Sequence, residues 1–210
     1  DLVRQNWPER LGKAPREMVT GVPAYVDGSG LSIAADAGAR LVNSDRMWHY
    51  TEGIQNWDPV WPGHGIRILS APSPMWFDAL GRRLPAPYLP GYDTMGTLRH
   101  LRTTPDIAEY DHSWLILNER IIAKEFALSG SEQNPDITSG SKVEVVKSRL
   151  AKGVPGPVQA FVDQGADFVV ADRIEDLVQK MNALTDEPLL DAAQVRKQIR
   201  DRDLQVANPF

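Results

Sequence analysis

The stretch that decides the fold reads Asp27-Gly-Ser-Gly-Leu-Ser-Ile-Ala-Ala-Asp-Ala-Gly-Ala-Arg-Leu-Val-Asn43. A loop with two glycines opens a run of small residues, which predicts a helix from Leu31 to Ala37. Gly38 can supply the left-handed backbone conformation that ends a helix. The run that follows, Arg40 to Asn43, is extended and apolar and predicts a strand. The sequence therefore favours a loop, a helix and a strand in succession.

Composition excludes several classes of function. The 210 residues are 42% hydrophobic, enough for the core of one ordinary domain or two small ones. The net charge of -5, with no basic run interleaved with aromatic residues, argues against a nucleic-acid partner. No apolar run is long enough to span a bilayer, and no leader is recognisable, so we expect no membrane span. The absence of cysteine excludes disulfides and thiolate sites and fits a cytoplasmic protein.

Residues 54–110 are rich in proline, glycine and aromatic side chains, a composition that favours short strands and shaped loops. A strand is predicted from Gly65 to Leu69. A strand, a turn at Gly81 and a second strand are predicted between Met75 and Leu84. The other elements predicted here are a helix over 94–103 and a buried strand over 113–117. Function is expected in this irregular middle.

The last hundred residues are predicted to be mostly helical. We expect Asp172 to cap a helix through Met181, with Glu175 completing a capping box, and Asp191 to help start a final helix through about Val206. The charged run 196–202 is interpreted as a solvated helix face. The other elements predicted are helices over 119–128 and 142–152 and a strand over 168–171.

Three motifs in order carry a resemblance to a known family. They are Asp27-Gly-Ser-Gly30, Leu41-Val-Asn43 and His49-Tyr-Thr51. The whole chain resembles the middle section of flavoproteins related to fumarate reductase and 3-ketosteroid dehydrogenase. In that family a Thr-Gly-Asp-Gly loop opens a helix, a Leu-Val-Asp strand follows, and a His-Pro-Thr motif leads into an inserted capping domain. The chain also starts at Asp1 rather than at methionine, so we expect a piece of a longer protein.

The segment Leu89-Pro-Gly-Tyr-Asp-Thr-Met-Gly96 resembles the Pro-Tyr-Asp-x-Phe-Gly segment that carries the catalytic tyrosine of ketosteroid dehydrogenases. The resemblance implies that Tyr92 is catalytic. A phenol with a reference pKa of about 10 needs a cationic or hydrogen-bonding neighbour to act as a base. The alternative is a loop aromatic that packs under Pro90 and Trp76. Fumarate reductases carry an arginine in a Thr-Thr-Arg segment that this chain lacks, which favours a small hydrophobic, ketone-containing substrate.

The resemblance implies an α+β fold. Residues 54–210 would form the capping domain of a fumarate reductase-like flavoprotein, and residues 1–53 a helix-strand segment of its FAD-binding domain. The implied site residues are Asp27 and Ser29 toward FAD, and His49 and Tyr50 toward the substrate. No Gly-x-Gly-x-x-Gly loop is present. We therefore expect the chain to need the missing FAD-binding segments of its own protein, and by itself to bind FAD weakly or not at all and show no turnover.

The residues alone leave other interpretations open. The loop at Asp27 could be a plain helix cap, and His49 a structural histidine. The tryptophans could be core residues or line an apolar pocket. A self-standing module that holds a carbohydrate or peptide through its tryptophan and tyrosine residues is the alternative. Aromatic side chains exposed on one side would favour that module, and aromatic side chains buried beneath helices would favour the cap. Hydrolysis by His49 with Asp45 or Glu52 lacks a nucleophile elbow. The other histidines lie in separate segments, which argues against a metal site.

Overall fold

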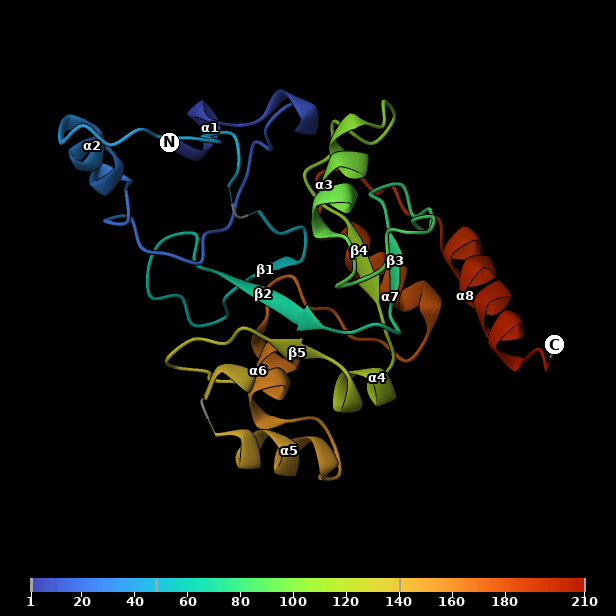
Figure 1. The fold of residues 1–210 in the computed structure, drawn as a ribbon. Helices are drawn as coiled ribbons and strands as arrows, with labels where there is room; N and C mark the ends of the chain where they lie inside the picture. The colour runs from blue at the N-terminus through green and yellow to red at the C-terminus, as the bar shows by residue number, and fades with distance from the viewer. Residues whose placement is uncertain (1, 48, 140, 210) are drawn as a thin grey trace.

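The computed structural model describes residues 2–47, 49–139 and 141–209. Helices and two small sheets alternate along the chain, so the fold is of the mixed α+β kind (Figure 1). The strands are β1 (Gly53–Gln55), β2 (Gly65–Ser70), β3 (Met75–Phe77), β4 (Trp114–Ile116) and β5 (Ala127–Leu128). The helices are α1 (Leu2–Gln5), η1 (Glu9–Leu11), α2 (Ser29–Asp36), α3 (Thr94–Thr103), α4 (Glu119–Lys124), η2 (Ile137–Ser139), α5 (Lys142–Leu150), α6 (Gly156–Gln164), α7 (Ile174–Asn182) and α8 (Ala192–Ala207).

Two antiparallel sheets form the centre of the molecule. In the first, β2 lies between β1 and β5, with Gly53 opposite Arg67 in the β1–β2 pair. The register between β2 and β5 shifts after Ile68, which faces Leu128. In the second sheet, β3 pairs with β4. A turn follows β3, and there Gly81 adopts φ +73°, as its predicted turn position requires.

The main core lies between the three-stranded sheet and α6. Ile66 and Leu128 come from the sheet, and Val158 and Phe161, three residues apart, come from one face of α6. Ala71 and Phe126 complete the buried group. Helix α6 was not predicted from the sequence, although Pro157 in its first turn suits a helix start. Burial of these large apolar side chains is the main force that holds α6 on the sheet.

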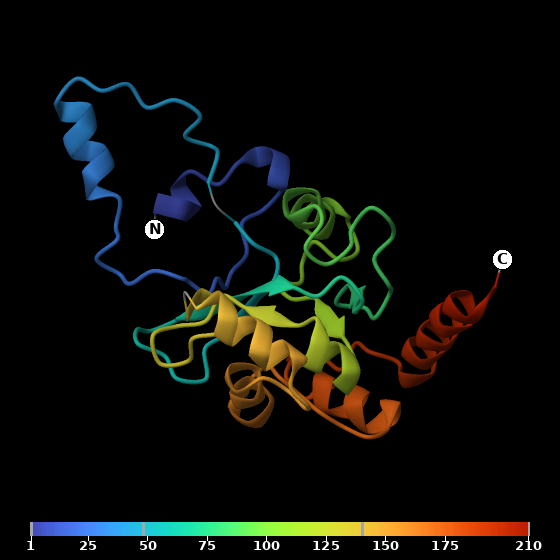
Figure 2. The same cartoon turned by 60° about the horizontal axis from the view of Figure 1, so that its bottom comes forward.

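A second core joins α7 and α8 to the smaller sheet. Val178 and Met181 of α7 pack with Leu190 and Val195, and Trp114 of β4 lies against them. Helix α8 begins where Asp191 accepts a hydrogen bond from the backbone N–H of Ala193, so the predicted cap is confirmed. Further along α8, Gln198 bonds to the backbone of Gly81 and Arg83, and Arg202 donates to the carbonyl of Ser73. Only the C-terminal end of the helix points away from the rest of the fold (Figures 1 and 2).

Residues 21–47 carry α2 away from the two sheets (Figures 1 and 2). They contact the N-terminal residues, where Leu2 lies against Gly28 and Arg10 pairs with Asp45. The predicted helix is confirmed, beginning two residues early at Ser29, and Gly38 follows it with φ +88° as predicted. No residue of α2 is buried, and Ile33 is 69% exposed. The strand predicted from Arg40 to Asn43 is wrong. This segment is extended and exposed, and no strand of the described chain lies beside it to share ladder hydrogen bonds.

Four other predictions fail wholly or in part. The second strand predicted before Leu84 is reduced to a single bridge between Phe77 and Arg83. Residues 168–171 form no strand, although Phe168 packs on the main core. The helix predicted over 119–128 ends at Lys124, and Ala127 and Leu128 join the sheet as β5. The capping box at Asp172 does not form, because Arg173 occupies the cap position of α7 and makes no side-chain cap bond. Glu175 instead pairs with Arg196 of α8.

Candidate active site

The loop before α3 places Tyr92 at the edge of that helix. Asp93 caps α3, since its Oδ1 accepts a hydrogen bond from the backbone N–H of Gly96 at 2.8 Å. The backbone N–H of Tyr92 donates to the carbonyl of Leu89 at 3.1 Å, and Gly91 takes a positive φ of +71° to allow the turn. The backbone on both sides of Tyr92 is therefore fixed by hydrogen bonds.

The side chain of Tyr92 faces outward. It is 74% exposed, so the alternative prediction that it packs under Pro90 and Trp76 is wrong. Trp76 is itself buried, and its Nε1–H donates to Ser113 Oγ at 2.9 Å. The phenol of Tyr92 is thus accessible at the N-terminal end of α3, which is a geometry that a group acting on a ligand requires.

His49 lies half-buried, with its ring tilted against Trp7 at a centroid distance of 4.7 Å. Burial lowers the pKa of His49, and the positive charge of Arg10 lowers it further. The imidazole is therefore neutral at physiological pH. Its Nε2 is buried and has no hydrogen-bond partner within the described ranges. A neutral imidazole with an unused nitrogen can bind a carbonyl or hydroxyl group.

Tyr50, the next residue, is held by a different contact. The guanidinium carbon of Arg67 lies 3.6 Å from the centre of the Tyr50 ring, a cation–π arrangement. Arg67 belongs to β2, opposite Gly53 of β1, and its Nε is also buried without a partner in the described part of the chain. Sequence reasoning missed Arg67, because only the strand register brings it to Tyr50.

Glu52 connects this segment with the helix that follows Tyr92. Its Oε1 accepts a hydrogen bond from Thr94 Oγ1 at 3.3 Å, and Thr94 is the first residue of α3. Its backbone carbonyl accepts from the N–H of Ile68 at 2.9 Å. The structure thus brings the segment with His49 and Tyr50 next to the start of α3. The predicted substrate-binding pair and the predicted catalytic residue are linked through one side-chain hydrogen bond, that of Glu52 to Thr94.

Asp27 and Ser29 lie elsewhere, at the start of α2, which both views place apart from α3 (Figures 1 and 2). Asp27 Oδ1 accepts from the Ser29 N–H at 2.9 Å, and this backbone hydrogen bond lowers the pKa of Asp27. A pyrophosphate needs several free N–H groups that converge at a helix start, without an anion beside them. The Ser29 N–H is occupied and Asp27 is negative, so these two residues do not by themselves fit that group.

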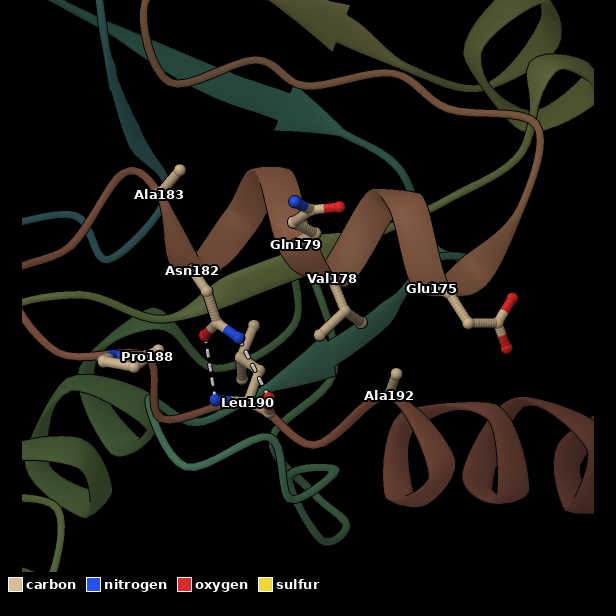
Figure 3. Close-up of a pocket in the computed structure, with 8 residues that line it drawn as sticks. All are labelled: Glu175, Val178, Gln179, Asn182, Ala183, Pro188, Leu190 and Ala192. Atoms are coloured by element: carbon tan, nitrogen blue, oxygen red, sulfur yellow. Dashed lines mark hydrogen bonds between the residues drawn. The ribbon is translucent and has the colours of Figure 1, made fainter.

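A separate hollow lies between α7 and the start of α8 (Figure 3). At its base the Asn182 side chain both donates to and accepts from the backbone of Leu190, at 3.0 Å and 2.9 Å. Glu175 at its rim is paired with Arg196. The lining, most of it apolar or amide, therefore forms the joint between two helices. It consists of Glu175, Val178, Gln179, Asn182, Ala183, Pro188, Leu190 and Ala192.

Two kinds of feature are absent from the residues that the structure describes. No three histidine, aspartate or glutamate side chains among them gather in a way that could hold a metal ion. None of the helices in the same ranges combines the length and the apolar character needed to cross a membrane.

Comparison with known proteins places the chain among flavoproteins. Residues 3–209 match the family described as FAD binding domain. A KsdD-like steroid dehydrogenase of Mycolicibacterium smegmatis is 58% identical over 210 residues. Two KsdD-like steroid dehydrogenases from different strains of Mycobacterium tuberculosis are 51% and 50% identical. These alignments cover 100% of this chain but only 36–38% of each relative, so the chain spans little more than a third of their length. No solved structure matches it.

Proposed function

Because this chain belongs to the FAD-binding domain family, we propose that it is the capping part of an FAD-dependent dehydrogenase, together with a piece of the flavin domain. Residues 54–210 would cover the flavin and shape the substrate pocket, and residues 1–53 would belong to the flavin domain. The exposed apolar side chains of α2, Leu31 and Ile33, support this division, since an apolar helix is normally covered in a complete protein. The segment before Thr20 also contacts residues 54–210. There the guanidinium of Arg102, in α3, donates to the carbonyl of Lys13.

The proposed reaction is the dehydrogenation of a hydrophobic, ketone-containing substrate of steroid type. The observation that carries it is the position of Tyr92, exposed on a fixed turn and joined through α3 to the His49 segment. The phenolic oxygen of Tyr92 would take a proton from a carbon beside the activating ketone while a hydride leaves the neighbouring carbon, and a double bond would form between the two. The phenol is largely exposed and meets no donor or cation among the described residues, so the missing segments of the enzyme would supply the neighbour that a phenolic base needs. FAD, when bound in the complete enzyme, supplies the hydride acceptor.

The other residues of the region have roles that fit this chemistry. Neutral His49 can bind the ketone oxygen through its unused Nε2, and the ring of Tyr50, held by Arg67, offers an apolar contact. The buried atoms without partners at His49, Thr51 and Glu52 fit polar contacts from a bound group or from the rest of the enzyme. The cap would exclude water from these contacts. Asp27 and Ser29 could contribute to an FAD site only with further N–H donors from the missing FAD-binding segments.

The aromatic residues support a cap over a self-standing carbohydrate or peptide module. None of the described tryptophans is exposed. Trp76 is buried in β3, and Trp57 packs on the core beneath α6. Flat sugar-binding or peptide-binding surfaces need exposed rings, so the tryptophan distribution favours the capping role, although Tyr25, Tyr50 and Tyr92 are exposed. The absence of cysteine is the support for the cytoplasmic location that we propose.

Two experiments test the proposal. Titration of the 210-residue chain with FAD should give no tight stoichiometric complex, and a shifted flavin spectrum at one equivalent would contradict the fragment assignment. In the full-length enzyme, Tyr92→Phe should lower kcat by about 100-fold or more and retain the flavin. Tyr88→Phe, in the same loop but stacked on His100, is the matched control and should keep normal turnover. Unchanged turnover in Tyr92→Phe would remove Tyr92 from the mechanism.

A further inference from the structure

The carboxylate of Glu52 is enclosed to an unusual degree for an acidic side chain. The residue is only 7% exposed, and it precedes β1, where its carbonyl is bonded to the sheet. Its Oε1 is bonded to Thr94, whereas its Oε2 is buried and meets no donor in the ranges that the structure describes. A buried carboxylate oxygen without a partner costs free energy, so Glu52 is a candidate for a role beyond packing.

The only hydrogen bond that an oxygen of this carboxylate makes within the described chain holds the first residue of α3. Thr94 follows Asp93, the cap of α3, and Asp93 follows Tyr92. The positive end of the helix dipole at this position also favours a nearby carboxylate. This 3.3 Å bond links the first residue of α3 to the residue that precedes β1. It lies two residues from Tyr92, whose own side chain is largely exposed.

We propose that Glu52 is a positioning residue for Tyr92, acting through its hydrogen bond to Thr94. This inference rests on the proposed catalytic role of Tyr92. Glu52 takes no part in proton transfer. It holds the first turn of α3 in one position relative to β1. The neighbouring turn, and with it the phenol of Tyr92, is thereby held in place. Because an error of about 1 Å in the position of a catalytic group can cost about 100-fold in rate, one bond at this point matters for turnover.

The test uses the full-length enzyme, a 3-ketosteroid and an artificial electron acceptor. Thr94→Val removes the donor and should lower kcat about tenfold, with KM and flavin content unchanged. Thr94→Ser restores a hydroxyl and should restore kcat. Thr103→Val is the matched control, because Thr103 also uses its hydroxyl, toward the Arg99 carbonyl, but at the far end of the same helix. This control should leave kcat unchanged.

Glu52 is tested by a double-mutant cycle. Glu52→Ala should lower kcat about as much as Thr94→Val, and the double variant should be no worse than the more severe single variant, since both remove the same bond. If Glu52→Ala loses flavin or fails to fold, the Thr94→Val and Thr94→Ser variants test the inference by themselves. Equal kcat in Thr94→Val and wild type, or losses that add fully in the double variant, would overturn the inference.

Variants of Tyr92 separate this inference from the proposed function. In a Tyr92→Phe background, Thr94→Val should cause no further loss, because the bond then has no base to position. If Tyr92→Phe alone retains full turnover, the proposed role of Tyr92 fails. If Tyr92→Phe lowers kcat strongly and Thr94→Val still lowers its residual rate about tenfold, the role of Tyr92 stands and the positioning role of Glu52 is wrong.

Discussion

Arg102 and Asp111 form an enclosed ion pair, with Nη1 of the guanidinium 2.9 Å from Oδ1 of the carboxylate and side chains 5% and 12% exposed. Arg102 also donates to the carbonyls of Lys13 and Tyr110, and Arg16 donates to the second carboxylate oxygen. The pair thus ties the N-terminal segment to the end of α3, the helix that begins beside Tyr92.

Asp111→Asn should make the free energy of unfolding depend less on pH in the acid range. Burial raises the pKa of Asp111, but the hydrogen bonds from Arg16 and the charge of Arg102 outweigh it, and the net pKa lies below the usual value. Stability from this group is therefore present above the unfolded pKa of about 4 and is lost as pH falls through the lower folded pKa. The variant should lose about 3 kcal/mol of unfolding free energy at neutral pH.

Urea unfolding of the wild type and Asp111→Asn at neutral pH and at about pH 3 measures the difference in their unfolding free energies. It should shrink at the lower pH, where the wild-type carboxylate begins to protonate. Asp106→Asn removes an exposed partner of Arg82 and serves as control, with little change expected at either pH. If Asp111→Asn loses the same unfolding free energy relative to wild type at both pH values, the lowered pKa of Asp111 does not contribute to stability as described.

Asp167→Asn should show the opposite pH dependence. Burial raises the pKa of Asp167, whose Oδ2 accepts from the Gln55 N–H at 2.8 Å and whose Oδ1 has no partner in the described ranges. With a raised folded pKa, the stability contribution is complete below the unfolded pKa of about 4 and is lost as pH rises toward the folded value. The amide keeps an acceptor for Gln55. We expect a higher Tm at neutral pH and little change at about pH 3, and a lower Tm at neutral pH would disprove this account.

Phe161→Ala should remove much of the support for α6. The ring is fully buried between α6 and the three-stranded sheet, so its truncation should cost about 3–5 kcal/mol of unfolding free energy in urea. Val143→Ala, on the exposed face of α5, should change the same quantity by less than about 0.5 kcal/mol. Comparable losses in the two variants would mean that α6 does not pack as described.

Asn182→Ala should loosen the joint between α7 and α8. The change removes two hydrogen bonds to Leu190, so we expect a loss of about 1–3 kcal/mol in unfolding free energy. Gln179→Ala, one turn earlier in the same lining, is the control, because this exposed side chain supports no comparable pair of bonds. Thermal unfolding of both variants checks the prediction, and equal Tm values would refute it.

Elements with a local signal could be predicted from the sequence. Helix α3 was predicted with its observed bounds because Met95, Leu98 and Leu101 recur at helical spacing, and α8 because Asp191 caps it. The failures concern pairing. Phe168 stands in an apolar run that resembles a strand, yet its ring packs edge-on against Phe126 at 5.8 Å and its backbone joins no sheet. An apolar run indicates that a segment is buried. Whether that segment becomes a strand depends on which backbone lies beside it in the fold.

The candidate site shows the same limit. Tyr92 and His49 could be selected because short motifs around them resemble a family. Glu52 and Thr94, which join the two regions, are 42 residues apart, and no local pattern links them. Arg67 reaches Tyr50 only because β1 and β2 pair in one register. Such contacts arise from tertiary geometry, and a single sequence contains no direct record of them.

Because no residue of α2 is buried, this helix can be used to detect when the chain joins the missing segments of the enzyme. A free helix of eight residues is only marginally stable in water, because few hydrogen bonds offset the entropy of its nucleation. With no buried residue to hold it, its amide protons should exchange with solvent quickly in this chain alone, whereas those of α6, which lies on a core, should exchange slowly. Amide hydrogen exchange at α2 would therefore show directly when the rest of the enzyme has closed over it.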